Sequence, residues 1–226
     1  MSHLKRLSMP KSWPIKRKGI KFVIKSKPGP HSLDTSIPLG IVLRDILRYC
    51  NTMREAKFIL NNKIILVDGR RRKDYRFPVG LFDIIRIADI EGAFRVVFDE
   101  KGGIKLISDK PLDVKLCKIV GKNKIKGKMQ LKFSDGKTLI LDKEGYNVGD
   151  SLFVNLPKMD VKEHIKFEKG ALIYLTGGKH IGETGRIDDV VADNIIYKND
   201  KNVLVATLKK YAFPVGKDKS LIKIKE

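Results

Sequence analysis

The segment KIILVDGRRRKDYR, residues 63–76, fixes the local fold around it. Its β-branched start is typical of a strand, and Asp68-Gly69 is a dipeptide that favours a two-residue hairpin turn. The chain returns through a run of cations and then reaches a second apolar stretch, Phe82 to Ile87. Because the cations follow a tight turn, we expect their side chains to point outward and to contact a polyanion. These cations are Arg70, Arg71, Arg72, Lys73 and Arg76.

Two short helices are predicted immediately before this hairpin. Apolar residues recur at helical spacing from Leu39 to Leu47. The tetrapeptide Thr52-Met53-Arg54-Glu55 has the form of a capping box, which starts the second helix. Basic residues of both helices are expected to extend the positive surface of the hairpin. Those taken as further contacts are Arg44, Arg54 and Lys57.

Helical periodicity ends near Gly92, and apolar stretches with strand-like alternation follow. These stretches are residues 94–98, 104–107, 114–116, 129–133 and 138–141. Glycine-containing turns are predicted at 101–103 and 134–137. Short, closely spaced strands joined by such turns predict a small β-barrel or sandwich.

A third β segment is predicted from about Phe167. A strand at 171–176 leads into the glycine-rich loop 177–185, and later strands are expected at 202–207 and 220–224. The loop is not a Walker phosphate loop, because strands rather than a helix flank its glycines. Its expected phosphate contacts are Lys179, His180 and Arg186.

The first 33 residues carry nine cations and no acid, the first carboxylate being Asp34. Such a stretch repels itself and buries little, so we expect an arm over residues 1–37 that becomes ordered on a polyanion. Trp13 has two interpretations, and packing on the protein is favoured over stacking on a base because a tryptophan buries a large area. The expected contacts of the arm are Lys5, Arg6, Lys11, Trp13, Lys16, Arg17, Lys18 and His31.

The whole chain shares this positive bias. Lys+Arg 47 against Asp+Glu 26 give a net charge of +21 and a pI of about 9.9, which favours nucleic acid as the partner. The 35 lysines and 12 arginines favour phosphate contacts over the reading of base edges. No long apolar run or basic amphipathic helix indicates a membrane. The N-terminus lacks the apolar core of a signal peptide, so a cytoplasmic location is expected.

No pattern for catalysis or metal binding is evident. Cys50 and Cys117 make no CxxC pair and are expected to be buried, reduced thiols. The four histidines show no metal-ligand spacing with them. We therefore expect no catalytic residue, no metal, no cofactor and no small-molecule substrate. The carboxylates interpreted instead as turn and surface groups are Asp74, Asp83, Asp150 and Asp160.

Two parts of the sequence resemble known modules. The helix with Arg54-Glu55-Ala56-Lys57, followed by Leu66-Val67-Asp68-Gly69, is similar to the S-four-type RNA-binding module of ribosomal proteins, RNA-modifying enzymes and some synthetases. In that family the helix pair and the hairpin loop face structured RNA. Residues 169–187 resemble a KOW motif, in which a glycine-bearing loop joins two strands of an SH3-like barrel.

The resemblance is more specific over the whole chain. In order, the matching segments are His3–Leu7, Pro10 with Trp13, Gly29–His31, Pro38-Leu39, Leu43–Asp45, Leu116–Lys118, Ile165–Phe167 and Thr176–Gly178. Together they resemble the e-type small-subunit ribosomal protein family S-four-e of archaea and eukaryotes. The lack of a long extension after Glu226 is more like the archaeal members. The resemblance implies a protein embedded in the small ribosomal subunit, bound to its RNA and to neighbouring ribosomal proteins.

The expected fold is mixed α/β and mostly β, in four parts. These are a basic arm at 1–37, an S-four-type module at 38–93, a central β-barrel-like domain at 94–166 and an SH3-like KOW barrel at 167–226. The expected function is structural and non-enzymatic, through phosphate contacts to small-subunit ribosomal RNA. Two alternatives remain: an RNA-modifying enzyme with an attached RNA-binding module, and a transcription elongation factor with a KOW barrel.

Two substitutions test these expectations. Charge reversal across Arg70, Arg71 and Arg72 should weaken RNA binding without unfolding the protein. Leu172→Asp should disrupt the last barrel, because it would bury an unpaired charge.

Overall fold

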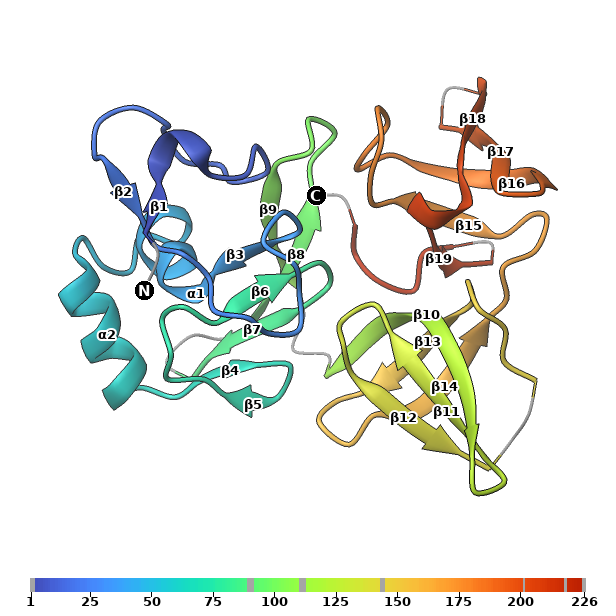
Figure 1. The fold of residues 1–226 in the computed structure, drawn as a ribbon, viewed down its shortest axis with the longest axis horizontal. Coiled ribbons are helices and arrows are strands. Elements are labelled where there is room, and N and C mark those ends of the chain that lie inside the picture. Colours follow the sequence, from blue (N-terminus) through green and yellow to red (C-terminus); the bar gives the residue numbers. More distant parts are fainter. Residues whose placement is uncertain are drawn as a thin grey trace. The chain divides into compact units, whose positions relative to one another are not determined.

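The computed structural model describes residues 3–88, 92–109, 113–142, 145–200, 202–217 and 219–224. The chain is mostly β with few helices, as predicted, and it divides into two compact units, Met1–Asp113 and Val114–Glu226 (Figure 1). No helix in the described part of the chain is long and apolar enough to cross a membrane. We describe each unit by itself.

The hairpin formed by residues 63–76 lies inside a five-stranded antiparallel sheet of the first unit. The sheet order is β5-β4-β7-β8-β9. Asp68 and Gly69 both have positive φ angles, 52° and 73°, and Val67 pairs with Arg70 across them, so the two-residue turn is confirmed. The strands are β4 (Ile65–Val67), β5 (Arg70–Arg71), β7 (Ile84–Ile87), β8 (Ala93–Phe98) and β9 (Ile104–Asp109).

Strands β8 and β9 place the boundary between the units later than expected. The sequence suggests a central domain that starts at residue 94, but Ile85 of β7 pairs with Phe94 of β8. The two strands therefore extend the hairpin's own sheet, and the division falls between Asp113 and Val114.

The predicted helices are present, and the first is shorter than expected and continues as a wider π-helical turn. Helix α1 (Leu39–Ile41) passes directly into a π-helical turn, Val42–Ile46, before α2 (Met53–Asn62) begins. The capping box is confirmed, because Thr52 Oγ1 accepts from the Glu55 N–H at 3.3 Å and Glu55 Oε2 accepts from the Asn51 N–H at 2.9 Å. The apolar residues that face the core are Leu39, Ile41, Val42, Leu43, Ala56 and Leu60.

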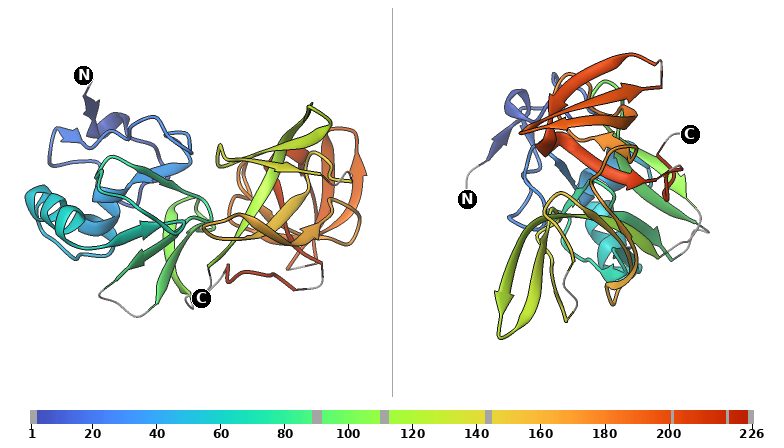
Figure 2. Two further views of the ribbon diagram at one scale, coloured as in Figure 1. Left: turned by 90° about the horizontal axis from the view of Figure 1, so that it is seen from below. Right: turned by 90° about the vertical axis from the view of Figure 1, so that its right-hand side faces the viewer.

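The basic N-terminal segment is anchored to its own unit through a few buried residues, while most of its residues are exposed, as the expectation that it buries little requires. Trp13 is only 3% exposed, and its indole Nε1 donates to the Ser36 carbonyl at 2.7 Å. The Ile104 N–H of β9 donates to the Ser12 carbonyl at 2.7 Å. In Figures 1 and 2 the blue N-terminal segment accordingly lies against the same unit as the cyan helices. The charged ends of its lysines reach solvent, while Met9 and Trp13 are buried. A high density of charge therefore does not prevent this segment from being ordered.

Short strands pin both ends of this segment. Strand β1 (Leu4–Lys5) pairs antiparallel with β2 (Phe22–Val23). Strand β3 (Ser36–Pro38) pairs antiparallel with β6 (Pro78–Gly80). The burial of Trp13 and its hydrogen bond to Ser36 confirm the favoured interpretation of this residue, packing on the protein.

The second unit contains two five-stranded antiparallel sheets, the first in the order β12-β11-β10-β13-β14. Its core is formed by residues of alternate positions, including Ile119, Leu131 and Val154. Cys117 also lies in this core, and both Cys117 and Cys50 are buried free thiols, as expected. The strands are β10 (Val114–Ile125), β11 (Lys128–Phe133), β12 (Thr138–Leu141), β13 (Ser151–Asn155) and β14 (Asp160–Ile165).

The second sheet has the order β18-β17-β16-β15-β19, so its first strand along the chain pairs with its last. The expected strand at 220–224 is replaced by one isolated bridge, Gly216 to Ser220. Leu172 is half-buried, whereas its neighbour Ile173 is fully buried. Leu172→Asp would therefore place its charge beside the core and not inside it. The strands are β15 (Leu172–Leu175), β16 (Thr184–Val191), β17 (Asn194–Asn199), β18 (Leu204–Leu208) and β19 (Ala212–Gly216).

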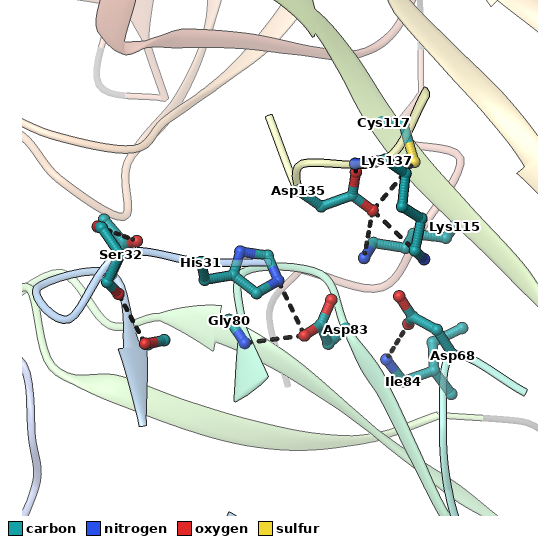
Figure 3. A network of polar contacts seen from close by, with 12 residues as sticks. His31, Ser32, Asp68, Gly80, Asp83, Ile84, Lys115, Cys117, Asp135 and Lys137 are labelled. Carbon is teal, nitrogen blue, oxygen red and sulfur yellow. Dashed lines mark hydrogen bonds and ion pairs between the residues drawn. The ribbon is translucent and has the colours of Figure 1, made fainter. Parts of the chain in front are cut away.

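Buried carboxylates hold turns in both units, which corrects their interpretation as surface groups. Asp83 is buried and accepts from His31 Nε2 and from the Gly80 N–H, each at 2.9 Å (Figure 3). Asp150 is also buried, and it accepts from His164 Nε2 at 2.8 Å. Each buried carboxylate thus has hydrogen-bond donors, which a charge removed from water requires.

A third buried pair lies in the second unit and was not foreseen. The Lys115 ammonium donates to Asp135 Oδ2 at 3.0 Å, and both side chains are almost completely buried (Figure 3). The Lys137 N–H donates to the other carboxylate oxygen at 3.2 Å. This pair fixes the predicted hairpin turn at 134–137 between β11 and β12.

Candidate nucleic-acid interface

Helix α2 and the β4–β5 hairpin present one cluster of cations, here called the hairpin surface. Arg71 Nη2 donates to the Asn61 carbonyl at 3.0 Å, which ties the hairpin to the end of the helix. The turn and the helix cap therefore fix the backbone that carries these charges before any ligand arrives. The exposed members of the hairpin surface are Arg54, Lys57, Arg70, Arg71 and Lys73.

Two other cations of the hairpin run lie on aromatic rings instead of standing free in solvent. The Arg72 guanidinium lies 4.3 Å from the centroid of Phe77, and that of Arg76 lies 5.3 Å from the centroid of Tyr75. Lys57 approaches the same Tyr75 ring at 4.7 Å. Arg72 and Arg76 are half-buried. They keep their charge but also pack, so their replacement changes the protein as well as the surface.

Acidic neighbours weaken two more of the cations near this surface. Arg44, an expected contact, pairs with Asp45 at 2.8 Å and is half-buried. Lys27 pairs with Asp74 at 2.5 Å, and the hydrogen bonds that Asp74 accepts hold the pKa of its carboxyl below the usual value despite the desolvation that opposes them. Asp74 is thus an ion-pair partner in the described structure.

The expected RNA contacts of the N-terminal segment fall into two groups, one turned into the protein and one exposed. Arg6, Trp13 and His31 are turned into the protein, and their assignment as RNA contacts is not supported by this conformation. Arg6 is 8% exposed and its Nε donates to the Lys16 carbonyl, while His31 is occupied by Asp83. The second group is exposed and comprises Lys5, Lys11, Lys16, Arg17 and Lys18.

The three predicted contacts in and beside the glycine-rich loop between β15 and β16 have different surroundings. Lys179 and Arg186 are exposed. His180 is half-buried, and its Nδ1 is 3.0 Å from Glu183 Oε1, so an internal carboxylate already binds the ring. The loop passes so close to Tyr211 that a Cβ at Gly177 would lie 2.5 Å from the tyrosine ring. That glycine is required by packing, whatever the loop binds.

Two features of the surface were missed from the sequence. Phe58 is 68% exposed on α2, one turn after Arg54, and the available signal was an apolar residue outside the buried face of the helix. Lys118 of β10 donates to the carbonyls of Lys210 and Ala212, at 3.0 and 2.5 Å. Burial, with a smaller effect of Lys209, lowers the pKa of Lys118 to about 8. No sequence signal marks Lys118, because its partners lie far along the chain.

Among the described residues, no group of three or more His, Cys, Asp or Glu side chains is placed to hold a metal ion. The titratable pairs that do occur, such as His164 with Asp150, bind backbone groups of turns.

Comparison with known protein families gives two matches. The family model described as "Ribosomal family S4e" matches residues 90–161, and the "RS4NT (NUC023) domain" matches residues 2–34. The second match coincides with the basic N-terminal segment.

Individual proteins match over nearly the full chain. The chain is 46% identical over 230 residues to a protein of Methanosphaera stadtmanae named "Small ribosomal subunit protein eS4", covering 98% of this chain and 95% of that protein. It is 40% identical over 236 residues to the protein of the same name from Methanocaldococcus jannaschii, covering 98% and 97%.

A solved structure agrees with the fold. The crystal structure of the 30S ribosomal protein S4e from Thermoplasma acidophilum matches with a TM-score of 0.72 and 33% identity, covering 84% of this chain and 100% of that one. The agreement in sequence extends from the N-terminal segment through both units. The resemblance found in the sequence is thereby confirmed, and the chain belongs to the ribosomal family S4e.

Proposed function

We propose that this protein is a structural component of the small ribosomal subunit and binds small-subunit ribosomal RNA mainly through its phosphates. The relatives that match over nearly the whole chain are named as small-subunit ribosomal proteins, which supports the structural role. The observation that carries RNA binding is the hairpin surface, five exposed cations on a hairpin and a helix that hydrogen-bond to each other. Fixed cations displace counterions from RNA without first having to be ordered.

Three groups of cations would share the RNA. The hairpin surface forms the first, the exposed lysines and arginine of the N-terminal segment the second, and Lys179 with Arg186 the third. We assign residues 38–93 as an S-four-type RNA-binding module, because helix α2 and the adjacent hairpin carry the first group. We assign residues 167–226 as an SH3-like KOW barrel, because a glycine loop joins β15 to β16 in a five-stranded antiparallel sheet.

The proposed partners are the ribosomal RNA and neighbouring proteins of the small subunit, within cytoplasmic ribosomes. Proteins of this family are structural and not enzymes, which removes the RNA-modifying enzyme from the alternatives. Fractionation of a cell extract distinguishes the proposed function from the remaining alternative, a transcription elongation factor. We expect the protein to sediment with small ribosomal particles and to be released by high salt, and co-purification with RNA polymerase instead would contradict the proposal.

A salt titration tests the phosphate mechanism directly. Binding of the full chain to small-subunit ribosomal RNA is measured between about 50 and 200 mM salt. If about six to ten phosphates are bound, the affinity should fall about 10³- to 10⁵-fold over this range. The variant Arg70→Gln/Arg71→Gln/Lys73→Gln should bind more weakly, and each lost contact should reduce the slope of log affinity against log salt by about one.

A matched control separates the hairpin surface from total charge. The variant Lys126→Gln/Lys158→Gln/Lys162→Gln removes the same charge from exposed positions of the second unit. It should keep most of the affinity and slope. Equal losses in the two triple variants would show that net charge, and not the hairpin surface, governs binding, and a flat titration of the unchanged protein would contradict phosphate binding itself.

A further inference from the structure

An open groove of about 630 Å³ lies in the first unit beside the N-terminal strands, here called the N-terminal groove. Its walls come from segments that are distant in sequence: β1 with Arg6, residues 20–28 around β2, Arg44, Met53, and Tyr75 with Arg76. The volume lies within the range of about 300–1,000 Å³ that is usual for sites taking a small organic group. The packed N-terminal segment creates this groove, so an unpacked arm would not form it.

The inner wall of the groove is apolar and open to solvent. Ile20 is 66% exposed and Phe22 is 44% exposed, and Leu4 and Ile24 beside them are half-buried. The His3 and Phe22 rings are nearly perpendicular, with a centroid distance of 5.2 Å. Apolar side chains that gather at one concave place mark a binding site more often than scattered ones do.

The charges of the groove all have one sign. Its lining includes five lysine or arginine side chains and no carboxylate, namely Arg6, Lys25, Lys27, Arg44 and Arg76. Two of these cations are partly neutralised, because Arg44 and Lys27 form ion pairs with Asp45 and Asp74. Lys21 Nζ also stands 5.5 Å from the centroid of Phe22. An occupant must therefore combine a flat apolar part with negative charge.

We propose that the N-terminal groove holds an unpaired nucleotide of the ribosomal RNA, with its base against Phe22 and Ile20 and its phosphates at the exposed lysines Lys21 and Lys25. This inference rests on the proposed function and adds to it a contact with a base. A nucleotide meets both requirements of the groove, since every base has an apolar face and every link a phosphate. A protein segment is disfavoured, because a rim of only positive charge selects against the basic surfaces of other RNA-binding proteins.

The test uses Phe22→Ala in the full chain, with Leu7→Ala as its matched control. Leu7 is 69% exposed in the same segment and does not line the groove. Binding to small-subunit ribosomal RNA is measured over a series of salt concentrations. Phe22→Ala should lower the affinity about 5- to 150-fold, the range for loss of one stacked base, with the salt slope unchanged because no phosphate contact is lost. Phe22→Tyr should retain the affinity, and Leu7→Ala should leave it unchanged.

A second measurement keeps the proposal falsifiable if Phe22→Ala alters the fold. Ultraviolet crosslinking of the unchanged protein to the same RNA, followed by peptide mass spectrometry, should attach a nucleotide to a peptide that contains Phe22 or Tyr75. Crosslinks found only outside the groove would overturn the inference.

The outcomes also separate this inference from the proposed function. If the unchanged protein binds RNA with a steep salt dependence while Phe22→Ala binds equally well, the groove is not a nucleotide site and the proposed function stands. If the unchanged protein shows no salt-dependent binding, the proposed function itself fails. Loss of affinity for a purified small-subunit protein, with RNA affinity unchanged, would assign the groove to a protein partner and overturn the inference.

Discussion

The N-terminal segment and the hairpin surface are both dense in cations, yet they use them differently. In the hairpin, the turn at Asp68-Gly69 leads into a run of cations of which Arg70, Arg71 and Lys73 are exposed. In the N-terminal segment, Arg6 and Trp13 are turned inward and hold the chain against its own unit. Charge density alone therefore indicates a polyanion as the partner, but it does not say which cations meet it.

The difference has a simple physical origin. A tight turn dictates the direction of its neighbours from local geometry, which a short sequence window contains. The N-terminal segment is fixed by contacts over long separations, such as Trp13 with Ser36 and Ser12 with Ile104. Its lysines cost little to order, because their heads remain in water.

The largest expected effect comes from removing the anchor of the N-terminal segment. Trp13→Ala loses a buried indole and its hydrogen bond to Ser36, and it should lower the free energy of unfolding by about 3–5 kcal/mol. Denaturant unfolding followed by circular dichroism measures this, with Lys11→Ala, an exposed neighbour, as the control. Unchanged stability of Trp13→Ala would show that the segment is an unpacked arm after all and would erase the comparison.

The parts of the fold that local patterns encode were predictable from the sequence. The capping box at Thr52, the turn at Asp68-Gly69 and the hairpin at 134–137 all appear where the sequence places them. Strand β19 (Ala212–Gly216) contains Pro214 and was not predicted; it lies at the edge of its sheet, where a proline is tolerated. The pair His31–Asp83 was missed because 52 residues separate its members.

The candidate site divides in the same way. Exposure of Arg70 and Arg71 follows from the turn, whereas burial of Arg6 and packing of Arg72 on Phe77 depend on partners that no local pattern identifies. The N-terminal groove was unforeseen for the same reason, since its walls come from separate segments that only the folded chain brings together.

The second prediction compares neighbouring cations of the N-terminal segment. Arg6→Ala removes a buried side chain and its hydrogen bond to the Lys16 carbonyl, so it should lower the free energy of unfolding by about 1–2 kcal/mol. Lys5→Ala, at an exposed position, should change stability little and weaken RNA binding. Thermal unfolding followed by Trp13 fluorescence and RNA binding are measured for both variants. If the two behave alike, Arg6 is not an anchor.

The third prediction makes the same comparison within the hairpin. Arg72→Gln loses its position on the Phe77 ring and should lower the free energy of unfolding by about 1 kcal/mol, whereas Arg70→Gln should lower only RNA affinity. Charge reversal across Arg70, Arg71 and Arg72 would thus mix two effects, and Lys73 is the better third position. Denaturant unfolding of the single variants tests this, and equal stability would show that the ring contact contributes nothing.

The smallest effect concerns the helix that carries Arg54 and Lys57. Hydrogen bonds from the Asn51 N–H and the Thr52 hydroxyl hold the pKa of Glu55 below its ordinary value of 4.5. Because the folded state lowers this pKa, the stabilisation is present above the ordinary value and is lost as pH falls through the folded pKa. The melting temperature should therefore fall less steeply below pH 4.5 in Glu55→Gln than in the unchanged protein. Since an amide oxygen can still accept from Asn51, Glu55→Gln should keep the cap at neutral pH, and Glu55→Ala should lower the melting temperature there by removing it. Parallel pH profiles for all three proteins would mean that the cap does not fix α2. Two of the five cations of the hairpin surface, Arg54 and Lys57, would then lack the rigid support that distinguishes this surface from the N-terminal segment.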